Sequence, residues 1–405
     1  MIIRNFDVTS VAGAAQVSAE VVWEESARAS FDLHFRVPTE HAALISANAD
    51  AFLTAALYPA RRAGERRVRV EGEVCPYLVR GLETALHWHW HWFGERCPIV
   101  AIEAPARTRP IATRDAAGAL LFFSGGADCM HTLRRNRLEV PISHPAAISH
   151  GLVIEGFDMR RGNTYARSLE ASRLVAADAD VALVPVTTNV RDLDLDDEFW
   201  DWEFHGAALA SVAHVFAGAF DLAYIASGIE IESLFPWGSH PLVDPLYSSC
   251  DIKVRHDSAE VPRLEKIRLL AEWPIALDNM RVCYRHPQNS LNCEECEKCV
   301  RTMVELVAVG ALERAGAFRH TDITAELVRA VRFSLQYHRI RWEEMIPDLE
   351  RRGRSDLVAA IREIVTRFHR WDAWKHERDW KGRIKRFDRR FLGGRLLPYL
   401  RRLYA

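Results

Sequence analysis

The feature that most restricts the fold of this chain is an alternation of short apolar runs with helix-length segments between residues 118 and 283. The apolar runs are short and end at turn-forming residues, so they predict buried strands. Helix-length segments between successive strands are typical of βα units, which build a parallel sheet. The expected strands are 120–123, 147–154, 181–186 and 222–226, and the expected helices are 128–137, 165–177, 200–219 and 261–272. The sequence therefore predicts an α/β fold.

The regions on either side have a different pattern. Residues 1–110 begin with alternating stretches typical of antiparallel strands and contain two helical patterns, which together predict a small α+β domain. Residues 311–405 are helical and amphipathic. We therefore expect three parts: an N-terminal α+β domain at 1–110, a parallel-sheet domain at 111–310 and a C-terminal helical region at 311–405.

Composition excludes several classes of protein. With 405 residues, 49% of them hydrophobic and 27% charged, the chain is too long and too balanced for a disordered tail, a collagenous fibre or a disulfide-stapled miniprotein. A formal net charge of −2 excludes a globally basic nucleic-acid coat. The first ten residues lack the apolar core of a signal peptide, and no later segment offers about 18 uninterrupted apolar residues. We expect a soluble, cytoplasmic protein.

A glycine loop follows the first expected strand of the central region. Its sequence is Ser124-Gly125-Gly126-Ala127-Asp128, and a helical pattern begins directly after it. Two glycines let backbone N–H groups approach a phosphate closely, and a helix N-terminus favours negative charge. Because a carboxylate repels phosphate, the role we expect for Asp128 is to hold a Mg²⁺ that neutralises the phosphate charge. The alternative is an ordinary turn in which Asp128 is only a first-turn helix charge.

Four of the eight cysteines lie within 17 residues, with the spacing C-x9-C-x2-C-x2-C. Four thiolates at such short separations can close a tetrahedron around Zn²⁺ and leave no open position, which predicts a structural metal site. An iron–sulfur cluster and unligated reduced thiols remain as alternatives. The expected ligands are Cys283, Cys293, Cys296 and Cys299.

The glycine loop resembles the PP-loop of the ATP pyrophosphatase superfamily, written Ser-Gly-Gly-x-Asp-Ser/Thr, with Cys129 in place of the final hydroxyl residue. Together with the cysteine cluster, the loop is similar to the 7-cyano-7-deazaguanine synthase branch known from queuosine biosynthesis, over about residues 118–310. Members of the superfamily cleave ATP between its α and β phosphates. Enlarged relatives of the synthase occur in bacterial antiphage gene sets, where they are thought to join a deazapurine to a protein.

The resemblance implies an ATP-dependent ligase that forms a carbon–nitrogen bond and uses ATP, Mg²⁺ and Zn²⁺. A carboxylate or amide of a deazapurine-like substrate would be adenylated, and an amine would then displace AMP to give an amide, a nitrile or a protein conjugate. Nucleotide binding is implied for Ser124, Gly125, Gly126, Asp128 and Gly228, and catalytic roles for Asp128 and Lys266. The true substrate, the nitrogen donor and the oligomeric state stay open.

The family's substrate loop, Tyr-Pro-Asp-Cys-Arg, is replaced here by residues 235–245. This loop contains His240 and Asp244 and is expected to follow the carboxyl end of a sheet strand, where open α/β sheets bind ligands. We therefore assign both residues to the substrate site. The alternative is a rigid, proline-braced loop without a ligand.

Two other functions are compatible with the sequence. RNA base thiolation would need a catalytic cysteine near the nucleotide, for which Cys129 and Cys250 are the candidates. A catalytically idle, zinc-stabilised binding module would need neither. Cys129→Ser separates the first alternative from ligation, because the serine restores the usual loop and should abolish only thiolation.

Three further stretches have structural explanations that we favour over functional ones. The alternating histidines and tryptophans of 87–92 are more typical of a packed helix end than of a metal or base-stacking site, and the acidic stretch 192–201 is more typical of a helix cap than of a second metal site. The tail from Lys381 carries nine basic residues against one acid, which suits a terminal helix docked on the core. RNA, an anionic membrane surface and an acidic protein partner are the functional alternatives, and of these we favour a partner protein.

Overall fold

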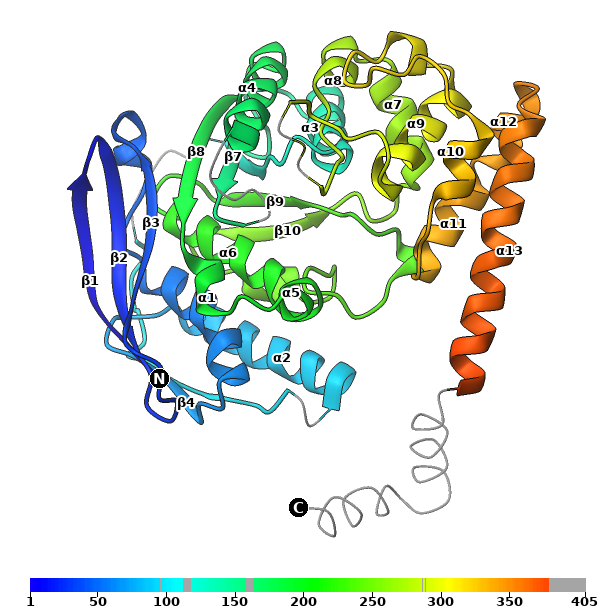
Figure 1. Ribbon diagram of the computed structural model, residues 1–405. Helices are drawn as coiled ribbons and strands as arrows, with labels where there is room; N and C mark the ends of the chain where they lie inside the picture. The colour runs from blue at the N-terminus through cyan, green and yellow to red at the C-terminus, as the bar shows by residue number, and fades with distance from the viewer. Residues whose placement is uncertain (95–96, 112–117, 158–162, 286, 288, 379–405) are drawn as a thin grey trace. The chain divides into compact units, whose positions relative to one another are not determined.

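The computed structural model describes residues 1–94, 97–111, 118–157, 163–285, 287 and 289–378 (Figure 1). Contacts between residues divide the chain into two compact units, residues 1–322 and residues 323–405. The first unit contains one ten-stranded sheet in the order β10-β9-β6-β7-β8-β3-β2-β1-β4-β5. The predicted α/β class is confirmed. The strands are β1 (Ile2–Val11), β2 (Ala14–Val22), β3 (Phe31–Pro38), β4 (Arg67–Val70), β5 (Ala101–Glu103), β6 (Ala119–Phe122), β7 (Ile148–Glu155), β8 (Ala182–Thr188), β9 (Leu222–Ala226) and β10 (Lys253–Asp257).

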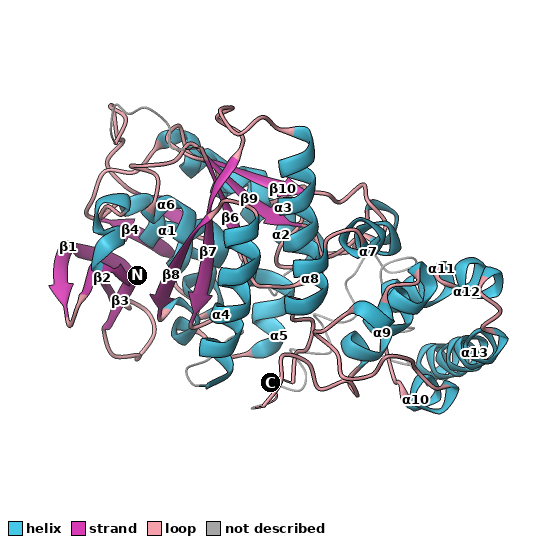
Figure 2. Cartoon of the chain, turned by 90° about the horizontal axis from the view of Figure 1, so that it is seen from above, coloured by secondary structure: helices cyan, strands magenta, loops and turns pink. Residues whose placement is uncertain are grey.

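The helices of the first unit lie on both faces of the sheet, as Figures 1 and 2 show. The α-helices of this unit are α1 (Ala49–Arg62), α2 (Pro76–Phe93), α3 (Ala127–Glu139), α4 (Asn163–Asp178), α5 (Asp197–Phe199), α6 (His205–Val215), α7 (Arg263–Ala271), α8 (Pro274–Asn279) and α9 (Glu297–Val309). Short 3-10 or π turns are η1 (Thr39–Leu44), η3 (Val190–Leu193), η4 (Trp200–Phe204), η5 (Ile231–Ser233), η6 (Asp244–Tyr247) and η7 (Leu312–Arg314).

The sheet has a parallel half and a mixed half. Strands β10, β9, β6, β7 and β8 run parallel, whereas β3 pairs antiparallel with β8 through Phe35 opposite Thr188. The antiparallel strands β2 and β1 follow, and β4 and β5 are parallel to β1. The segments expected as an N-terminal domain and as a parallel-sheet domain therefore share one continuous sheet.

Burial on both faces explains the apolar runs of the central strands. In β6 all four residues are buried, and Leu120 and Phe122 join the core formed with helices α1 and α6. Side chains of neighbouring residues in a strand point to opposite faces, so Ala119 and Leu121 face the side of α3 and α4. A strand that is covered twice reads as a continuous apolar run, which is why the sequence reveals it.

The connections create a switch in strand order beside β6. Helices α3 and α4 connect β6 to β7 and β7 to β8 in order along the sheet, and the chain then passes through α6 and returns to β9 on the other side of β6. The carboxyl ends of β6, β7 and β9 therefore lie on the same side of the sheet. From there the chain leaves β6 toward β7 and leaves β9 toward β10, which lie in opposite directions along the strand order. Open α/β sheets bind ligands at such a point.

Three elements differ from the sequence prediction. Strand β10 was not expected because it lies at the sheet edge, where Lys253 and Arg255 are exposed and only its alternate residues reach the core. The helix expected over 200–219 is interrupted, since a π turn occupies Trp200–Phe204 before α6 begins. In the helical region expected from residue 311, the amphipathic pattern of residues 323–337 spans two helices, since one ends at Ala330 and the next begins at Gln336.

The second unit is helical, as predicted for this part of the chain. Its helices are α10 (Ala325–Ala330), α11 (Gln336–Glu344), α12 (Ile346–Arg351) and α13 (Ser355–Arg378). The long helix α13 packs against the three shorter ones and buries Leu357, Ile361 and Ile364. The basic tail from Lys381 lies outside the described residues. Among the described helices, none combines the length and the apolar character needed to cross a membrane.

A glycine in the middle of α2 gives a test of the packing between α2 and η6. A Cβ atom on Gly81 would overlap the backbone carbonyl oxygen of Leu246. We expect Gly81→Ala to lower the free energy of unfolding by about 1–3 kcal/mol, because the backbone must shift to admit the methyl group. Urea denaturation measures this change.

Gly218→Ala is the control for that substitution, since the nearest atom to its added Cβ is the Ser46 hydroxyl at 3.6 Å. Alanine at position 218 should change stability little. If Gly81→Ala were as stable as the parent protein, the close approach of α2 and η6 would be wrong.

Candidate functional site

A cavity of about 240 Å³ lies at the carboxyl ends of β6, β7 and β9. Its walls are mostly apolar, and its polar groups come from the glycine loop and from Arg281. An apolar cavity with a few converging polar groups is the usual form of a small-molecule site. The lining residues are Phe122, Phe123, Ser124, Gly126, Asp128, Cys129, Leu152, Ile154, Phe157, Leu209, Ile225, Ala226 and Arg281.

The glycine loop has the backbone geometry of an anion site. Gly125 has φ +74°, a left-handed conformation in which a side chain is strained. Gly126 is the N-cap residue of α3, and no side chain forms a capping hydrogen bond there. Because glycine has no side chain, the N-cap residue does not cap the first-turn N–H groups of α3. The helix dipole also favours negative charge at this end. The loop predicted from the sequence thus lies in the expected strand, turn and helix context.

Asp128 is held by two cations from α7. One carboxylate oxygen accepts a hydrogen bond from Lys266 Nζ at 3.2 Å, and the other accepts one from Arg263 at 3.1 Å. The Asp128 side chain is 28% exposed and lines the cavity, whereas Lys266 is 1% exposed and lies behind it. Lys266 also donates to the carbonyl oxygen of Ser227 at 2.6 Å, directly after β9. The structure therefore brings Asp128 and Lys266 together, with Asp128 nearer the cavity.

A buried chain of alternating charges connects Asp128 to α9. Arg263 pairs with Glu305 at 3.3 Å, and Glu305 pairs with Arg301 at 2.6 Å. Arg301 then pairs with Glu297 at 2.8 Å, beside the cysteine cluster. All four of these side chains are at most 7% exposed, so each depends on its neighbours to offset its charge. The charge of Arg301, which the sequence placed beside the cysteines, is therefore matched by two glutamates.

His131 on α3 is a neutral neighbour of this network. Burial and, after it, the Lys266 ammonium lower the pKa of His131 to about 4. The imidazole is therefore uncharged near pH 7, since protonation there would add a buried cation next to an existing one. His131 therefore adds no charge to the network of Asp128, Lys266 and Arg263.

Arg281 is a site residue that the sequence analysis missed. Its backbone N–H donates to the Gly125 carbonyl oxygen at 2.8 Å, and its guanidinium donates to the Ser124 carbonyl oxygen at 3.3 Å. Of the described residues that line the cavity, Arg281 carries the cationic side chain. Its sequence position, two residues before Cys283, was the available signal, but proximity to an expected metal ligand does not by itself indicate contact with Ser124, 157 residues earlier in the chain.

Cys129 fills the position where the PP-loop motif has a hydroxyl. Its thiol is buried, donates to the Gly126 carbonyl oxygen at 3.0 Å and lies 3.6 Å from the Ser124 hydroxyl. Burial raises the pKa of the Cys129 thiol. Because the thiolate is the reactive form of cysteine, this environment suits a packing residue of the loop better than a nucleophile.

Gly228 lies directly after Ser227, at the end of β9. A Cβ atom at this position would meet nothing within 4 Å, and its φ lies outside the left-handed range. Neither space nor backbone conformation therefore requires glycine here. Gly228 lies near the carboxyl end of β9, but it is not among the described residues that line the cavity.

His240 and Asp244 are buried in the protein interior and do not line the cavity. Asp244 accepts hydrogen bonds from the Ser239 hydroxyl at 2.6 Å and the His240 backbone N–H at 3.1 Å, and it lies 2.7 Å from His256 Nδ1. The His240 ring packs against Trp92 with 4.9 Å between centroids, and burial lowers the pKa of His240. Both residues that the sequence assigned to the substrate site are thus engaged in contacts within the fold.

Cys250 lies at the amino ends of the parallel strands, whereas the glycine loop lies at their carboxyl ends. It precedes β10, whose partner β9 runs parallel to β6, so it lies near the amino ends of these strands. The glycine loop follows the carboxyl end of β6. Cys250 is therefore not brought to the cavity, and its backbone N–H contacts the Cys75 sulfur instead.

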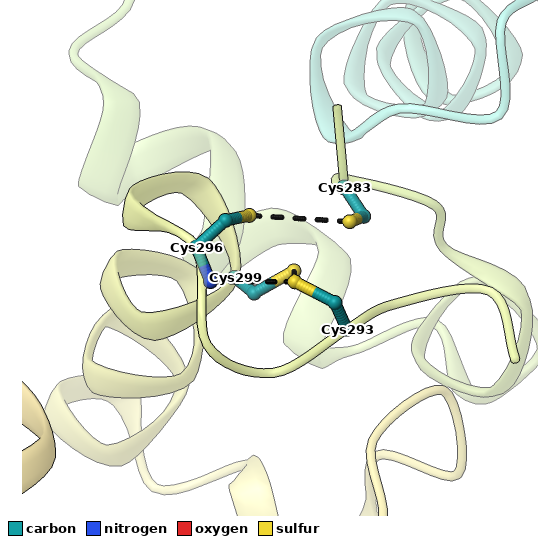
Figure 3. A group of neighbouring side chains, drawn as sticks. All are labelled: Cys283, Cys293, Cys296 and Cys299. Atoms are coloured by element: carbon teal, nitrogen blue, oxygen red, sulfur yellow. Dashed lines mark hydrogen bonds between the residues drawn. The ribbon is translucent and has the colours of Figure 1, made fainter. Parts of the chain in front are cut away.

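The four clustered cysteines form a group that can hold a metal ion (Figure 3). Their sulfur atoms all lie within 4.8 Å of one another, and the pairs Cys283 with Cys296 and Cys293 with Cys299 are each 3.9 Å apart. A tetrahedral site with metal–sulfur bonds of about 2.3 Å requires sulfur atoms about 3.8 Å apart. Cys296 is the N-cap residue of α9, where the helix dipole favours thiolate. Iron–sulfur clusters need wider spacing because their ligands surround several irons.

The other stretches follow their structural explanations. Within α2, His87 and His91 are exposed while His89 is buried between aromatic rings, where burial lowers its pKa well below the usual value. In the acidic stretch, Asp196 accepts from the Phe199 backbone N–H and caps α5, and Arg62 pairs with it at 2.7 Å. Among the described residues, the cysteine group is the one metal-binding cluster found.

Comparison of the chain with protein-family models, with curated proteins and with solved structures finds no match in any of the three.

Metal content tests the cysteine group directly. We expect purified protein to contain about one metal ion per chain, bound by four thiolates. Cys293→Ser should lower this content, since it removes one ligand, and elemental analysis by mass spectrometry measures the change. Cys250→Ser removes an exposed thiol outside the group and should leave the metal content unchanged. Several irons per chain, or no metal at all, would contradict the assignment.

Proposed function

We propose that this chain is an ATP-dependent PP-loop enzyme that adenylates a carboxylate or amide oxygen and then forms a carbon–nitrogen bond. The observation that carries the proposal is the cavity at the switch in strand order, whose polar end is the glycine loop, Asp128 and Arg281. The phosphates would lie against this polar end, and the adenine against apolar residues such as Ile154 and Phe157.

Each polar group has a distinct task in this proposal. Backbone N–H groups of the glycine loop would hydrogen-bond the departing pyrophosphate, with Ser124 adding a hydroxyl donor. Asp128 would hold Mg²⁺, which supplies charge neutralisation for the phosphates; the carboxylate suits this hard ion, and Mg²⁺ commonly uses one or two carboxylates with substrate phosphates. Lys266 would position Asp128, to which it donates at 3.2 Å, rather than contact the reacting atoms. Arg281 would supply the positive charge at the cavity surface.

The proposed reaction has two steps, adenylation of the substrate and displacement of AMP by a nitrogen nucleophile. A substrate carboxylate oxygen attacks the α-phosphorus, the bond to the bridging α–β oxygen breaks, and pyrophosphate leaves with that electron pair. An amine or ammonia then attacks the activated carbonyl carbon, AMP leaves with its oxygen, and the nitrogen loses a proton to water. The product is an amide, from which a further activation of the amide oxygen would give a nitrile. A deazapurine-like acceptor is proposed from the sequence resemblance, and a protein amine remains a candidate donor.

Zinc is the metal that we propose for the cysteine group. Four closely spaced thiolates and no open position suit a structural Zn²⁺ site, which would fix the Cys283 segment to α9. This role is separate from catalysis.

The alternative functions have less support. RNA thiolation would need a reactive thiol at the nucleotide, but Cys129 is buried with a raised pKa and Cys250 lies at the other edge of the sheet. An idle binding module would not need the buried pairing of Asp128 with Lys266 and Arg263.

Incubation with ATP, Mg²⁺ and 7-carboxy-7-deazaguanine, with and without ammonia, tests the proposal. We expect release of AMP and pyrophosphate and a changed mass of the deazapurine, measured by mass spectrometry; a mass increase on a co-purifying protein would favour conjugation. Asp128→Asn should lower the rate by about 100-fold or more, because charge stabilisation at the phosphates is lost. Glu139→Gln removes an exposed carboxylate from the same helix and serves as the control.

If pyrophosphate never appears with ATP, the deazapurine and cell metabolites, the enzyme assignment is wrong. If it appears but Asp128→Asn is as active as the parent protein, the chemistry is located elsewhere.

Cys129→Ser separates ligation from thiolation. The serine hydroxyl can replace the thiol's hydrogen bond to Gly126 and restores the usual PP-loop residue. We expect the rate of pyrophosphate release to stay within about threefold of the parent rate, since a hydroxyl donor replaces a weak thiol donor. Complete loss of activity in this variant would instead support thiolation.

A further inference from the structure

We propose that Asn292 and Arg281 make phosphate binding at the glycine loop depend on a metal-loaded cysteine group. The inference rests on the proposed function in one respect, namely that a nucleotide polyphosphate binds at this loop. It assigns positioning roles to two residues that neither the motif nor the cysteine spacing identifies.

The first step is the attachment of the segment before Cys283. Asn292 is fully buried, and its side-chain oxygen accepts hydrogen bonds from the backbone N–H groups of Val282 at 2.9 Å and Cys283 at 3.3 Å. Its side-chain nitrogen donates to the carbonyl oxygens of Met280 at 2.9 Å and Ala317 at 3.1 Å. One amide therefore fixes the backbone of residues 280–283 on both sides of Arg281.

The second step is the contact of Arg281 with the loop. The backbone N–H of Arg281 binds the Gly125 carbonyl, and its guanidinium reaches the carbonyls of Ser124 and Cys283 at 3.3 and 3.4 Å. A trans peptide is planar, and its C=O and N–H point in opposite directions. Holding the Ser124 and Gly125 carbonyls therefore also sets the directions of the Gly125 and Gly126 N–H groups, which are the donors of a phosphate-binding loop.

The third step is the dependence on metal. Cys283 is the last residue of the fixed segment, and Cys293 directly follows Asn292, so one tetrahedral ion would join the two ends of this arrangement. Without an ion, hydrogen bonds are what join the two ends. The left-handed Gly125 conformation then loses part of its support. We expect the metal-free protein to have a less ordered glycine loop.

Binding of a non-hydrolysable ATP analogue with Mg²⁺, followed by calorimetry, tests the coupling without requiring turnover. Asn292→Ala and Arg281→Ala should each weaken binding by about tenfold or more. The first removes buried hydrogen bonds that hold residues 280–283, and the second removes the guanidinium contact with the Ser124 carbonyl together with the positive charge at the cavity. Both variants should keep the metal content of the parent protein, since all four cysteines remain. Hydrogen exchange at the amides of residues 125–128 should become faster in both.

Arg285→Ala is the matched control, because Arg285 is an exposed arginine beside the same cysteines and pairs with Glu295 on the surface. It should leave binding and exchange unchanged. Asn292→Asp keeps the accepting oxygen and loses the donors, so an intermediate affinity is expected if Asn292→Ala folds poorly. Removal of the metal with a chelator should weaken binding, and adding Zn²⁺ back should restore it.

The outcomes separate the two proposals. If the metal-loaded parent protein does not bind the ATP analogue, the proposed function fails and the coupling fails with it. If the parent binds the analogue but the Asn292 and Arg281 variants and the chelated protein bind it within about twofold, which is less than the loss of one buried hydrogen bond, only the coupling is wrong.

Discussion

The buried ion pairs that end at Asp128 are the interaction on which the rest of the site depends. They connect the first turn of α3, the start of α7 and the middle of α9 through Arg263, Glu305 and Arg301. A charge removed from water is costly unless a partner offsets it, so no member can move independently of its neighbours. The position of Asp128 at the cavity is therefore set by helices that begin 135 and more residues later in the chain.

The glycine loop is consequently held from two sides. The ion pairs fix the helix that follows the loop, and Arg281 fixes the two carbonyls within it. Both connections lead back to the cysteine group, one through Glu297 beside Cys296 and the other through Asn292 beside Cys293. The cysteine group and the glycine loop, which are separate in the sequence, are thus held by the same set of contacts.

Part of the loop at 235–245 is buried in a core to which the N-terminal strands contribute. These strands extend the sheet through β3, and α1, α2 and α6 pack on one face of it in a single continuous core. His240 and Asp244 are buried in that interior, in contact with Trp92 and His256 respectively. The two residues that we assigned to the substrate site therefore brace the layer between α2 and β10, and other residues line the cavity.

The sequence alone determined the α/β class, the strands that are buried on both faces, the glycine loop and the four cysteines, because each is encoded by local periodicity or by short spacing. It could not determine which charges pair. Lys266 and Arg263 lie on one expected helix, and only the packing of α7 against α3 brings both of them to Asp128. It also missed β10, whose edge position leaves a weak apolar pattern, and Arg281, whose contact with Ser124 spans 157 residues. Periodicity records that a face is buried but not what buries it, so the joining of the N-terminal strands to the central sheet and the assembly of the site were decided only by tertiary packing.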